Sequence, residues 1–384
     1  MSDPRLAHVE QFNRDIVTPI KNAFVGKDEI VDLMAVALVG GENLFLFGPP
    51  GTAKSALVRE LALRMKGRSF DYLLTRFSEP NELFGPFDIR KLREGDLITN
   101  TEGMLPEADF VFLDELLNAN SAVLNSLLMV LNERIFRRGR ENRKLDTLMV
   151  VGASNHLPDD DALSALFDRF LLRVNCQNVP TEMLPEVLSA GWKLDHQAES
   201  LEGSITVDDV RVLQSLIRDV DLSGIQSCYV ELIHRLRHAG ISVSDRRAVR
   251  LQKVVAASAI LCGRLNAVAS DLWVLRYIWD SEEQQTVLES IVQDAITAAG
   301  ASTSNDHPRS TGTDQADAEQ LSRDLTRLSD RITQPDLAEP DKVYLRDQLG
   351  LLAGRCQWVA DEQQRVHLES QVAAVWPQFG ESDG

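Results

Sequence analysis

The sequence contains few cysteines for its length, and they lie far apart. Cys176, Cys228, Cys262 and Cys356 are the four cysteines among 384 residues, and no two of them form a Cys-x-x-Cys pair. This spacing argues against a disulfide framework and against a zinc site. We expect buried free thiols, because free cysteine is among the most buried residue types.

Long apolar runs are also absent. The longest uncharged one, "LMAVALV" at 33–39, is much shorter than the roughly 20 residues that span a bilayer. The start, "MSDPRLAHVEQ", has no basic segment followed by an apolar one, as a signal peptide would. With 44% hydrophobic and 26% charged residues, the composition is typical of a soluble globular protein, and we expect a cytoplasmic one.

Positive charge is scarce as well. The chain has 40 Lys and Arg residues against 58 Asp and Glu residues, which gives a formal net charge of −18. A surface of this charge repels a polyanion, so nucleic acid is a poor candidate partner. One short segment is nevertheless strongly basic, and its basic residues are Arg137, Arg138, Arg140, Arg143 and Lys144. Two interpretations of this cluster stay open: a solvated hairpin tip, or a ring of positive charge that faces a central pore and grips an acidic partner.

Strand-like and helix-like segments alternate from residue 4 to about 180. The expected strands are at 43–47, 71–77, 109–115, 147–154 and 170–176, and three of them are almost continuously apolar. Such runs are typical of strands buried on both faces of a parallel sheet. We therefore predict an α/β nucleotide-binding core over 1–180. The long segment between the second and third strands is interpreted as an inserted hairpin, with two extended pieces around "REGD".

Helical periodicity follows almost throughout 181–298, which predicts an all-helical lid domain. The stretch 299–318 is rich in Ser, Thr, Gly and Asp, and we expect a flexible linker there. Beyond it, leucines at positions 321, 325 and 328 and later at 345, 349 and 352 recur with helical spacing. Residues 319–384 are therefore predicted to form a helical hairpin joined at 333–340.

"GPPGTAKS" at 48–55 differs by one residue from the phosphate-loop pattern G-x-x-x-x-G-K-[ST], because Ala53 stands where glycine is usual. It follows an apolar strand and opens a helix, as a loop that aims backbone N–H groups at phosphates must. Lys54 can reach the β- and γ-phosphates, and Ser55 can offer its hydroxyl to Mg²⁺. Alanine at position 53 is acceptable if its φ is negative, where a Cβ has little steric cost.

Polar residues follow two further strands. "FVFLDE" at 110–115 ends a buried strand in two carboxylates, and a buried unpaired carboxylate is costly unless it serves a cation. Asp114 would hold Mg²⁺, and Glu115 would orient and activate the attacking water. "LMVVGASN" ends in Asn155, whose amide could bind the γ-phosphate or the water. Each segment alone could be an ordinary turn, but their order after a phosphate loop favours a nucleotide site.

These segments resemble the AAA+ ATPases and, more narrowly, the MoxR family, over roughly residues 15–260. The matching segments are "FVGKDE" at 24–29, "GPPGTAKS", "FVFLDEL", "GASN", "LFDRF" and "SVSDRR". Alanine before the lysine is frequent in MoxR-type loops. The insertion before "FVFLDE" is similar to the helix-two insert of this clade, and "IFRRGRENRKLD" to its hairpin before the sensor strand. "SEPNELFG" and "LLMVLNER" are most similar to the RavA-like branch.

The resemblance also implies roles for arginines. "LFDRF" carries the arginine finger, which by position is Arg169, and "SVSDRR" carries the second sensor, Arg246. Guanidinium suits both roles, because it stays charged and presents a planar fork to phosphate oxygens. Arg173 and Arg247 are neighbouring alternatives. The expected nucleotide-binding residues are Val25, Gly26, Gly48, Pro49, Pro50, Gly51, Thr52, Ala53, Lys54, Ser55 and Ala56, of which the first two match the segment that flanks the adenine.

The resemblance implies a function as well. It implies an AAA+ core with ATP or ADP and Mg²⁺ as ligands, a homo-oligomeric ring that is a hexamer, and remodelling of a protein together with a von Willebrand factor A (vWA) domain protein. Two alternatives stay open at this stage. One is a nucleotide-gated binding scaffold that threads no substrate, and the other is a motor on nucleic acid, which the net charge of −18 disfavours.

Overall fold

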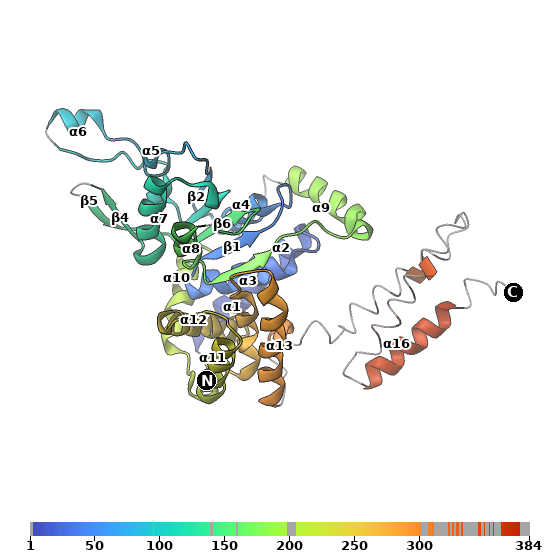
Figure 1. Ribbon diagram of the computed structural model, residues 1–384. Coiled ribbons are helices and arrows are strands. Elements are labelled where there is room, and N and C mark those ends of the chain that lie inside the picture. The colour runs from blue at the N-terminus through green and yellow to red at the C-terminus, as the bar shows by residue number, and fades with distance from the viewer. Residues whose placement is uncertain are drawn as a thin grey trace. The chain divides into compact units, whose positions relative to one another are not determined.

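The computed structural model describes residues 3–94, 96–138, 141–158, 160–197, 205–300, 306–310 and 362–376, with single positions between 322 and 356. The chain divides into two compact units, Met1–Ser310 and Thr311–Gly384. The first unit contains an α/β core and the helices that follow it (Figure 1).

A five-stranded sheet forms the centre of the first unit, in the order β2-β3-β6-β1-β7. All the neighbouring strands run parallel. The strands are β1 (Leu44–Phe47), β2 (Ser69–Leu73), β3 (Phe110–Asp114), β6 (Met149–Ser154) and β7 (Leu172–Asn175), and β4 (Ile135–Arg138) pairs with β5 (Glu141–Lys144) in a separate antiparallel hairpin. The five expected strands are therefore confirmed, with ends that differ by a few residues.

Helices connect and cover these strands. In the core they are α1 (Ala7–Phe12), α2 (Thr18–Ala23), α3 (Asp28–Gly40), α4 (Lys54–Arg64), α5 (Pro80–Phe84), α6 (Ile89–Arg93), α7 (Ser121–Glu133) and α8 (Asp161–Phe167). After the core come α9 (Leu184–Gln197), α10 (Val207–Leu216), α11 (Gln226–His238), α12 (Asp245–Leu261), the 3₁₀ segment η8 (Ala269–Tyr277) and α13 (Glu283–Ala298). The α/β core followed by a helical lid domain is thus confirmed.

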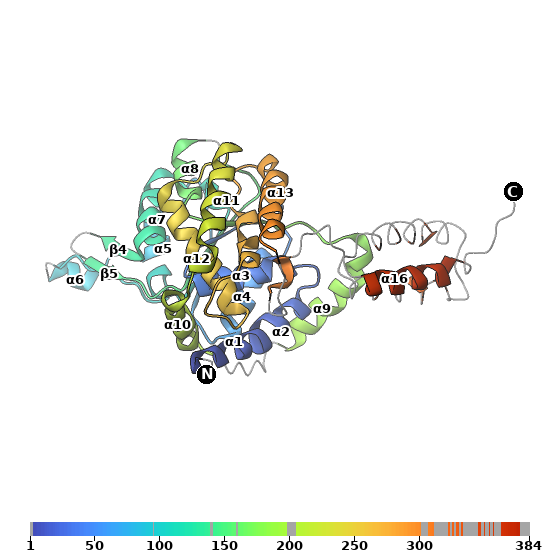
Figure 2. The same ribbon diagram turned by 90° about the horizontal axis from the view of Figure 1, so that it is seen from below.

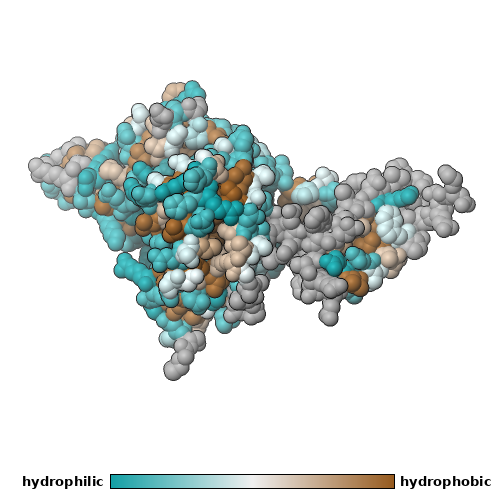
Figure 3. Space-filling model, turned by 60° about the horizontal axis from the view of Figure 1, so that its bottom comes forward, coloured by the Kyte–Doolittle hydropathy of each residue, from teal (hydrophilic) through white to brown (hydrophobic). Residues whose placement is uncertain are grey.

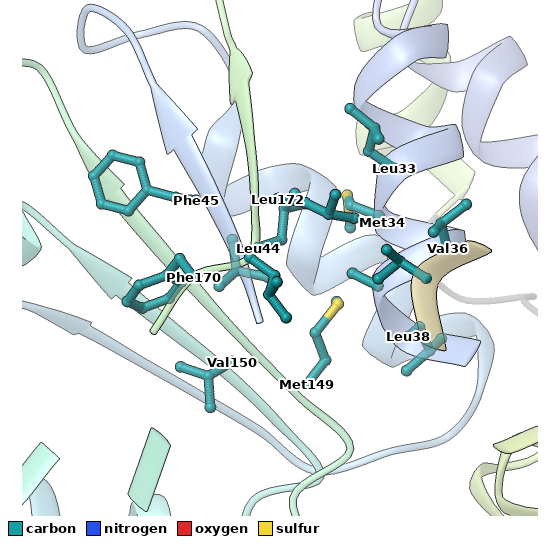
Figure 4. Packing of buried hydrophobic residues seen from close by; sticks show 14 of the residues in the cluster. Leu33, Met34, Val36, Leu38, Leu44, Phe45, Met149, Val150, Phe170 and Leu172 are labelled. Carbon is teal, nitrogen blue, oxygen red and sulfur yellow. The ribbon is translucent and has the colours of Figure 1, made fainter. Parts of the chain in front are cut away.

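The core lies on both sides of the central strand β1. Figure 4 shows Leu33, Met34 and Val36 of α3 on one side of the sheet, and Phe45 pointing to the other side. There the Phe45 ring meets the edges of the Phe167 and Phe170 rings, with centroids 4.9 and 5.6 Å apart. This two-sided burial explains why the strands are apolar at nearly every position.

The inserted segment between β2 and β3 differs from its prediction. One of the two extended pieces predicted around "REGD" contains helix α6 at Ile89–Arg93, and an antiparallel bridge between Phe87 and Thr99 joins the two arms. Hydrogen bonds from Asp88 N to Ile98 O (2.8 Å) and from Asn100 N to Pro86 O (2.8 Å) still give the arms a hairpin path. The prediction missed the helix because the segment is too short for a helical period to stand out.

This insert and the β4–β5 hairpin lie side by side, away from the sheet, in both Figure 1 and Figure 2. Arg138 of the hairpin stacks over the Phe87 ring (4.1 Å to its centroid) and donates to Gly85 O (2.6 Å). Glu141 accepts from the backbone N–H and the hydroxyl of Thr99, at 2.9 and 2.7 Å. The two insertions are therefore held together as one projection.

Part of the predicted flexible linker is packed against the first unit. The His307 ring stacks on Trp273 (centroids 4.4 Å apart), and Arg309 Nε lies 2.5 Å from Asp32 Oδ2. Burial lowers the pKa of His307 to about 4, so the ring is neutral at neutral pH. Residues 306–310 therefore depart from the prediction, because an ion pair and a stacked ring fix them. Residues 301–305 and 311–318 of the predicted linker lie outside the described residues.

The second unit has its own apolar cluster. Leu325, Leu328, Leu345, Leu349 and Cys356 are buried there, in keeping with their helical spacing. The same cluster contains Leu368, Val372 and Val375 of α16 (Glu362–Val375), a helix that the hairpin prediction did not include. The predicted connection at 333–340 lies outside the described residues.

The burial of the cysteines agrees only in part with the expectation of buried thiols. Cys176 and Cys356 are buried thiols as expected, whereas Cys228 and Cys262 are only partly buried. On the face drawn in Figure 3, hydrophilic residues cover much of the first unit, with hydrophobic ones between them. Of the helices that the structure describes, none has both the length and the apolar character needed to cross a bilayer.

Candidate functional site

The loop between β1 and α4 makes a turn that requires glycine. Gly48 has φ +154°, and a Cβ there would lie 2.2 Å from the carbonyl oxygen of Cys176. Gly51 has φ +82° and no atom within 4 Å of the Cβ position, so the space beside it is open. The backbone N–H of Gly48 donates to Ser154 O (3.0 Å), which fixes the start of the loop to β6.

Ala53 departs from its predicted conformation. Its φ is +66° rather than negative, because the chain must reverse before α4 begins at Lys54. A left-handed conformation costs a residue with a Cβ about 1–2 kcal/mol. The substitution that makes the loop differ from the phosphate-loop pattern is therefore a strained one, and the rest of the loop must hold it in place.

Lys54 points into the loop. Its ammonium donates to Gly48 O (2.6 Å) and Pro49 O (2.9 Å), and the side chain is buried. Thr52 Oγ1 also donates to Pro49 O (3.0 Å), and Cys176 Sγ donates to Thr52 O (3.3 Å). The loop thus holds a cation at its centre beside an open face, and this arrangement fits a phosphate chain.

Two carboxylates lie at the same edge of the sheet as this loop. Asp114 ends β3. In the sheet, β6 lies between β3 and β1, and β1 leads into the loop. The Asp114 carboxylate accepts from the backbone N–H of Glu115 (3.0 Å). Glu115 has φ +49°, a strained conformation that turns the chain sharply after the strand. Both side chains are half-buried, so they are partly shielded from water.

Asn155 stands at the end of β6, between the strand that carries Asp114 and the strand that leads into the loop. It directly follows β6, and the preceding residue Ser154 is paired with Phe47 at the end of β1. Its side chain is exposed to solvent in the described structure. The carboxyl ends of three parallel strands therefore bring the loop, Asp114 with Glu115, and Asn155 together.

The sequence analysis missed Asn118, which contacts Glu115, and His156, which contacts Asn118. Asn118 Nδ2 is 3.5 Å from Glu115 Oε2, and Asn118 Oδ1 is 3.4 Å from His156 Nε2. The other ring nitrogen of His156 faces Leu157 O at 3.2 Å. Asn118 follows Glu115 by three residues in a 3₁₀ turn. This three-residue spacing is the feature of the sequence from which the contact between the two side chains could have been predicted. The contact with His156 links residues far apart in the sequence and has no local signature.

The donor set suits Mg²⁺. Among the described residues, no group of three or more His, Cys, Asp or Glu side chains could hold a metal ion by itself. Mg²⁺ in nucleotide sites commonly takes one or two protein oxygens and completes its shell with phosphate oxygens and water. Ser55, in the first turn of α4, and Asp114, at the end of β3, are the protein oxygens at this edge that fit such a site.

The segment expected beside the adenine packs on the connection between β7 and α9. Gly26 has φ +73°, and a Cβ there would lie 2.9 Å from a methyl group of Val179. Lys27 Nζ donates to the carbonyl oxygen of Gln177. Gly26 and Lys27, which directly follow Val25, thus lie against the chain that connects β7 to α9.

Arg169 and Arg246 are not at this edge. Arg169 precedes β7, and its carbonyl oxygen accepts from Asn43 Nδ2 (3.2 Å) just before β1, so it lies at the amino edge of the sheet. The four residues of β1 separate that edge from the loop by about 13 Å. Arg246 lies 3.5 Å from Asn132 Oδ1 near the end of α7, whose Leu131 carbonyl also faces Asn43.

The alternatives Arg173 and Arg247 are built into the interior. Arg173 donates to Trp279 O (2.5 Å) and Asp280 Oδ1 (2.5 Å), and it stacks over the Phe167 ring. Burial, and to a lesser extent the charge of the nearby Arg247, lower its pKa to about 9. Arg247 Nη1 lies 3.3 Å from Asp280 as well. These two arginines tie β7 and α12 to the chain after η8, so in this structure they are not available to phosphate.

Comparisons with known proteins give matches over both the α/β core and the helices that follow it. Residues 10–215 match the family described as the MoxR domain in the MoxR-vWA-beta-propeller ternary systems, and residues 225–292 match an AAA lid domain. Two uncharacterized proteins of Methanocaldococcus jannaschii are 34% and 35% identical over 72% and 69% of this chain, and over 72% and 70% of their own. The chaperone MoxR1 of Mycobacterium tuberculosis is 29% identical over 41% of this chain and 42% of its own.

A solved structure is similar to the fold. The crystal structure of a protein of Cytophaga hutchinsonii, assigned as an ATPase, superposes with a TM-score of 0.63. The match covers 78% of this chain and 97% of that one, at 19% sequence identity. This likeness shows the fold alone, an α/β core followed by a helical lid.

Proposed function

The chain belongs to the MoxR family of AAA ATPases, and on this premise we propose that it hydrolyses ATP in a Mg²⁺-dependent reaction that drives the remodelling of a partner protein. One observation carries the proposal. The carboxyl edge of the sheet brings a glycine-rich loop, a buried lysine, two carboxylates and an asparagine to one place, although Gly48 and Asn155 are 107 positions apart in the sequence.

Each side chain at this edge has a role that suits its position. Lys54 neutralises the β- and γ-phosphates, while Ser55 and Asp114 hold Mg²⁺, which when bound spreads the charge of the phosphate oxygens. Glu115 orients and activates the attacking water, and Asn155 binds the γ-phosphate or that water. The strain at Glu115, with φ +49°, supports its assignment, because strained backbone collects at functional sites.

The position of Arg169 and Arg246 at the amino edge supports an oligomer with shared sites. A subunit cannot bring these arginines to its own loop across the length of β1, so they act on the site of a neighbouring subunit. An arrangement in which each amino edge faces the next carboxyl edge is head-to-tail, and such an arrangement forms a ring when the rotation between neighbouring subunits closes. We propose that this ring is a hexamer, as the family resemblance implies.

The partner is proposed from the family. The matching family is named after systems that combine MoxR, vWA and beta-propeller proteins, which supports a vWA domain protein as the partner of this chain. The narrower assignment to the RavA-like branch, the domain boundaries and the cytoplasmic location stay predictions.

The partner proposal is tested with a variant that binds ATP and hydrolyses it slowly. In the presence of ATP and Mg²⁺, immobilised Glu115→Gln protein should retain a purified vWA domain protein from the same organism longer than the wild type does. Lys54→Ala, which should not bind ATP, is the matched control and should retain none. Retention is measured by surface plasmon resonance. Equal dissociation rates for all three proteins would contradict coupling between the nucleotide and the partner.

The basic hairpin gives a second test. We expect Arg137→Ser, Arg138→Ser and Arg140→Ser combined to leave basal ATPase within a few-fold, because the hairpin lies away from the carboxyl edge. Arg137 is exposed and Arg138 holds the insert, whereas Arg140 lies outside the described residues. The combined variant should weaken partner binding, and Arg218→Ser on the lid surface is the control. Loss of basal hydrolysis would place the hairpin in the active site and refute its proposed role.

A further inference from the structure

Asn43 is a buried asparagine that links the start of β1 to the end of α7 and to Arg169, which precedes β7. It directly precedes β1, and 1% of its surface is exposed. Its amide nitrogen donates to Leu131 O at the end of α7 (3.4 Å) and to Arg169 O (3.2 Å). Its amide oxygen accepts from Arg134 Nη2 (2.7 Å). Both amide donors and the acceptor are therefore used, and the orientation of the amide is set by three different partners.

Arg134 is placed where an arginine is costly. It ends α7 with φ +53°, and its guanidinium is buried deeply enough to lower its pKa to about 10, although Glu42 opposes the shift. Nη1 has no hydrogen-bond partner among the described residues. The next residue, Ile135, begins strand β4 of the basic hairpin. The buried guanidinium thus connects the base of the hairpin to Asn43.

We propose that Asn43 and Arg134 are positioning residues that hold Arg169 in place for the neighbouring subunit and link it to the basic hairpin. This inference rests on the proposed function, in which Arg169 acts in trans. Arg134 fixes which way the Asn43 amide points, and that orientation presents an N–H group, not an oxygen, to the carbonyl of Arg169. The backbone from which the finger projects is then fixed against the start of β1.

A purely structural role would explain part of this geometry. The carbonyl of Leu131 is one of the last of its helix and needs a donor, which Asn43 supplies. A buried asparagine that only caps α7 would affect the stability of the fold. It would not selectively affect a reaction in the next subunit, and this difference can be measured.

Asn43→Asp keeps the shape and the acceptor for Arg134 but loses both donors, so kcat reports the positioning role while a thermal melt reports the capping role. A carboxylate oxygen would then face the carbonyl of Arg169. Since displacing a catalytic group by about 1 Å costs on the order of 10²-fold, we expect kcat to fall by about 10- to 100-fold, with KM for ATP nearly unchanged. Asn13→Asp is the control, because Asn13 makes one comparable bond, to Leu261 O (3.0 Å).

Arg134→Met is a second variant, in case Asn43→Asp does not fold. It removes a cation whose charge is already opposed by burial and whose Nη1 has no partner among the described residues, so the loss of the bond to Asn43 is partly offset. Without Arg134 the amide of Asn43 can turn over, so kcat should fall by a few-fold at unchanged KM. A folded Arg134→Met protein with the kcat of the wild type would contradict the proposal.

Mixing subunits gives the deciding result. Asn43→Asp subunits keep their own Glu115, and Glu115→Gln subunits keep their own Asn43, so mixed rings should regain ATPase above the sum of the two separate proteins. No gain, while Arg169→Ala mixed with Glu115→Gln does gain, would overturn this inference and leave the proposed function intact. No gain in either mixture would refute the shared site itself.

Discussion

Arg169→Ala is expected to lower kcat for ATP hydrolysis by on the order of 10³-fold, with little change in nucleotide affinity. An arginine that reaches the γ-phosphate from a neighbouring subunit stabilises charge that develops only in the transition state, and such fingers contribute about 10³- to 10⁵-fold. Arg169 lies at the edge of the sheet opposite the loop, so its loss should not disturb the binding of ATP to its own subunit.

The control for this experiment is Arg59→Ala. Arg59 is an exposed arginine of α4 that pairs with Asp71, and we expect its removal to leave kcat unchanged. Calorimetry gives the affinity, and a coupled assay gives kcat. A loss of ATP affinity that matches the loss of kcat would place Arg169 at its own site and contradict the proposed arrangement.

Lys54→Ala and Glu115→Gln are expected to fail in different ways. Lys54 is the buried cation inside the loop, bonded to Gly48 O and Pro49 O, so its removal leaves the phosphate charge without its main counter-charge and should abolish binding. Glu115→Gln removes only a base, and general bases contribute about 10²- to 10⁴-fold. That variant should bind ATP normally and hydrolyse it 10²- to 10⁴-fold more slowly.

Calorimetry with ATP and Mg²⁺ separates these two outcomes. The conservative variant Glu115→Asp serves as an intermediate case, because it keeps a carboxylate but shortens its reach. Equal loss of binding in Lys54→Ala and Glu115→Gln would show that the roles are wrong. Full hydrolysis by Glu115→Gln would exclude Glu115 as the residue that activates water.

The α/β core could be predicted because its signals are local. A parallel strand buried on both faces is apolar at nearly every position, and Phe110–Asp114 and Met149–Ser154 show this clearly. Parallel strands end at a common edge, and Asp114, Glu115 and Asn155 stand at the ends of two strands that share this edge with the loop. Their location follows from element type and sheet geometry, whereas their roles stay predictions.

The parts that were not predicted depend on contacts between distant residues. Arg309 was assigned to a flexible linker by composition, yet it pairs with Asp32, 277 positions away in the chain. Asn43 is a single asparagine that precedes a strand, and nothing in the adjacent sequence indicates that it contacts Arg134 and Arg169. Alanine at position 53 was judged acceptable on the condition of a negative φ, and the positive φ depends on the reversal of the chain before α4 rather than on the preference of the residue.

The shared site is tested most directly by mixing Arg169→Ala with Glu115→Gln subunits, both nearly inactive alone. In a mixed ring, an intact Arg169 from one subunit meets an intact Glu115 of its neighbour at some interfaces. We predict that ATPase activity rises above the sum of the separate proteins, and that the specific activity of the wild type rises with protein concentration. No gain on mixing, together with activity that is independent of concentration, would contradict the account.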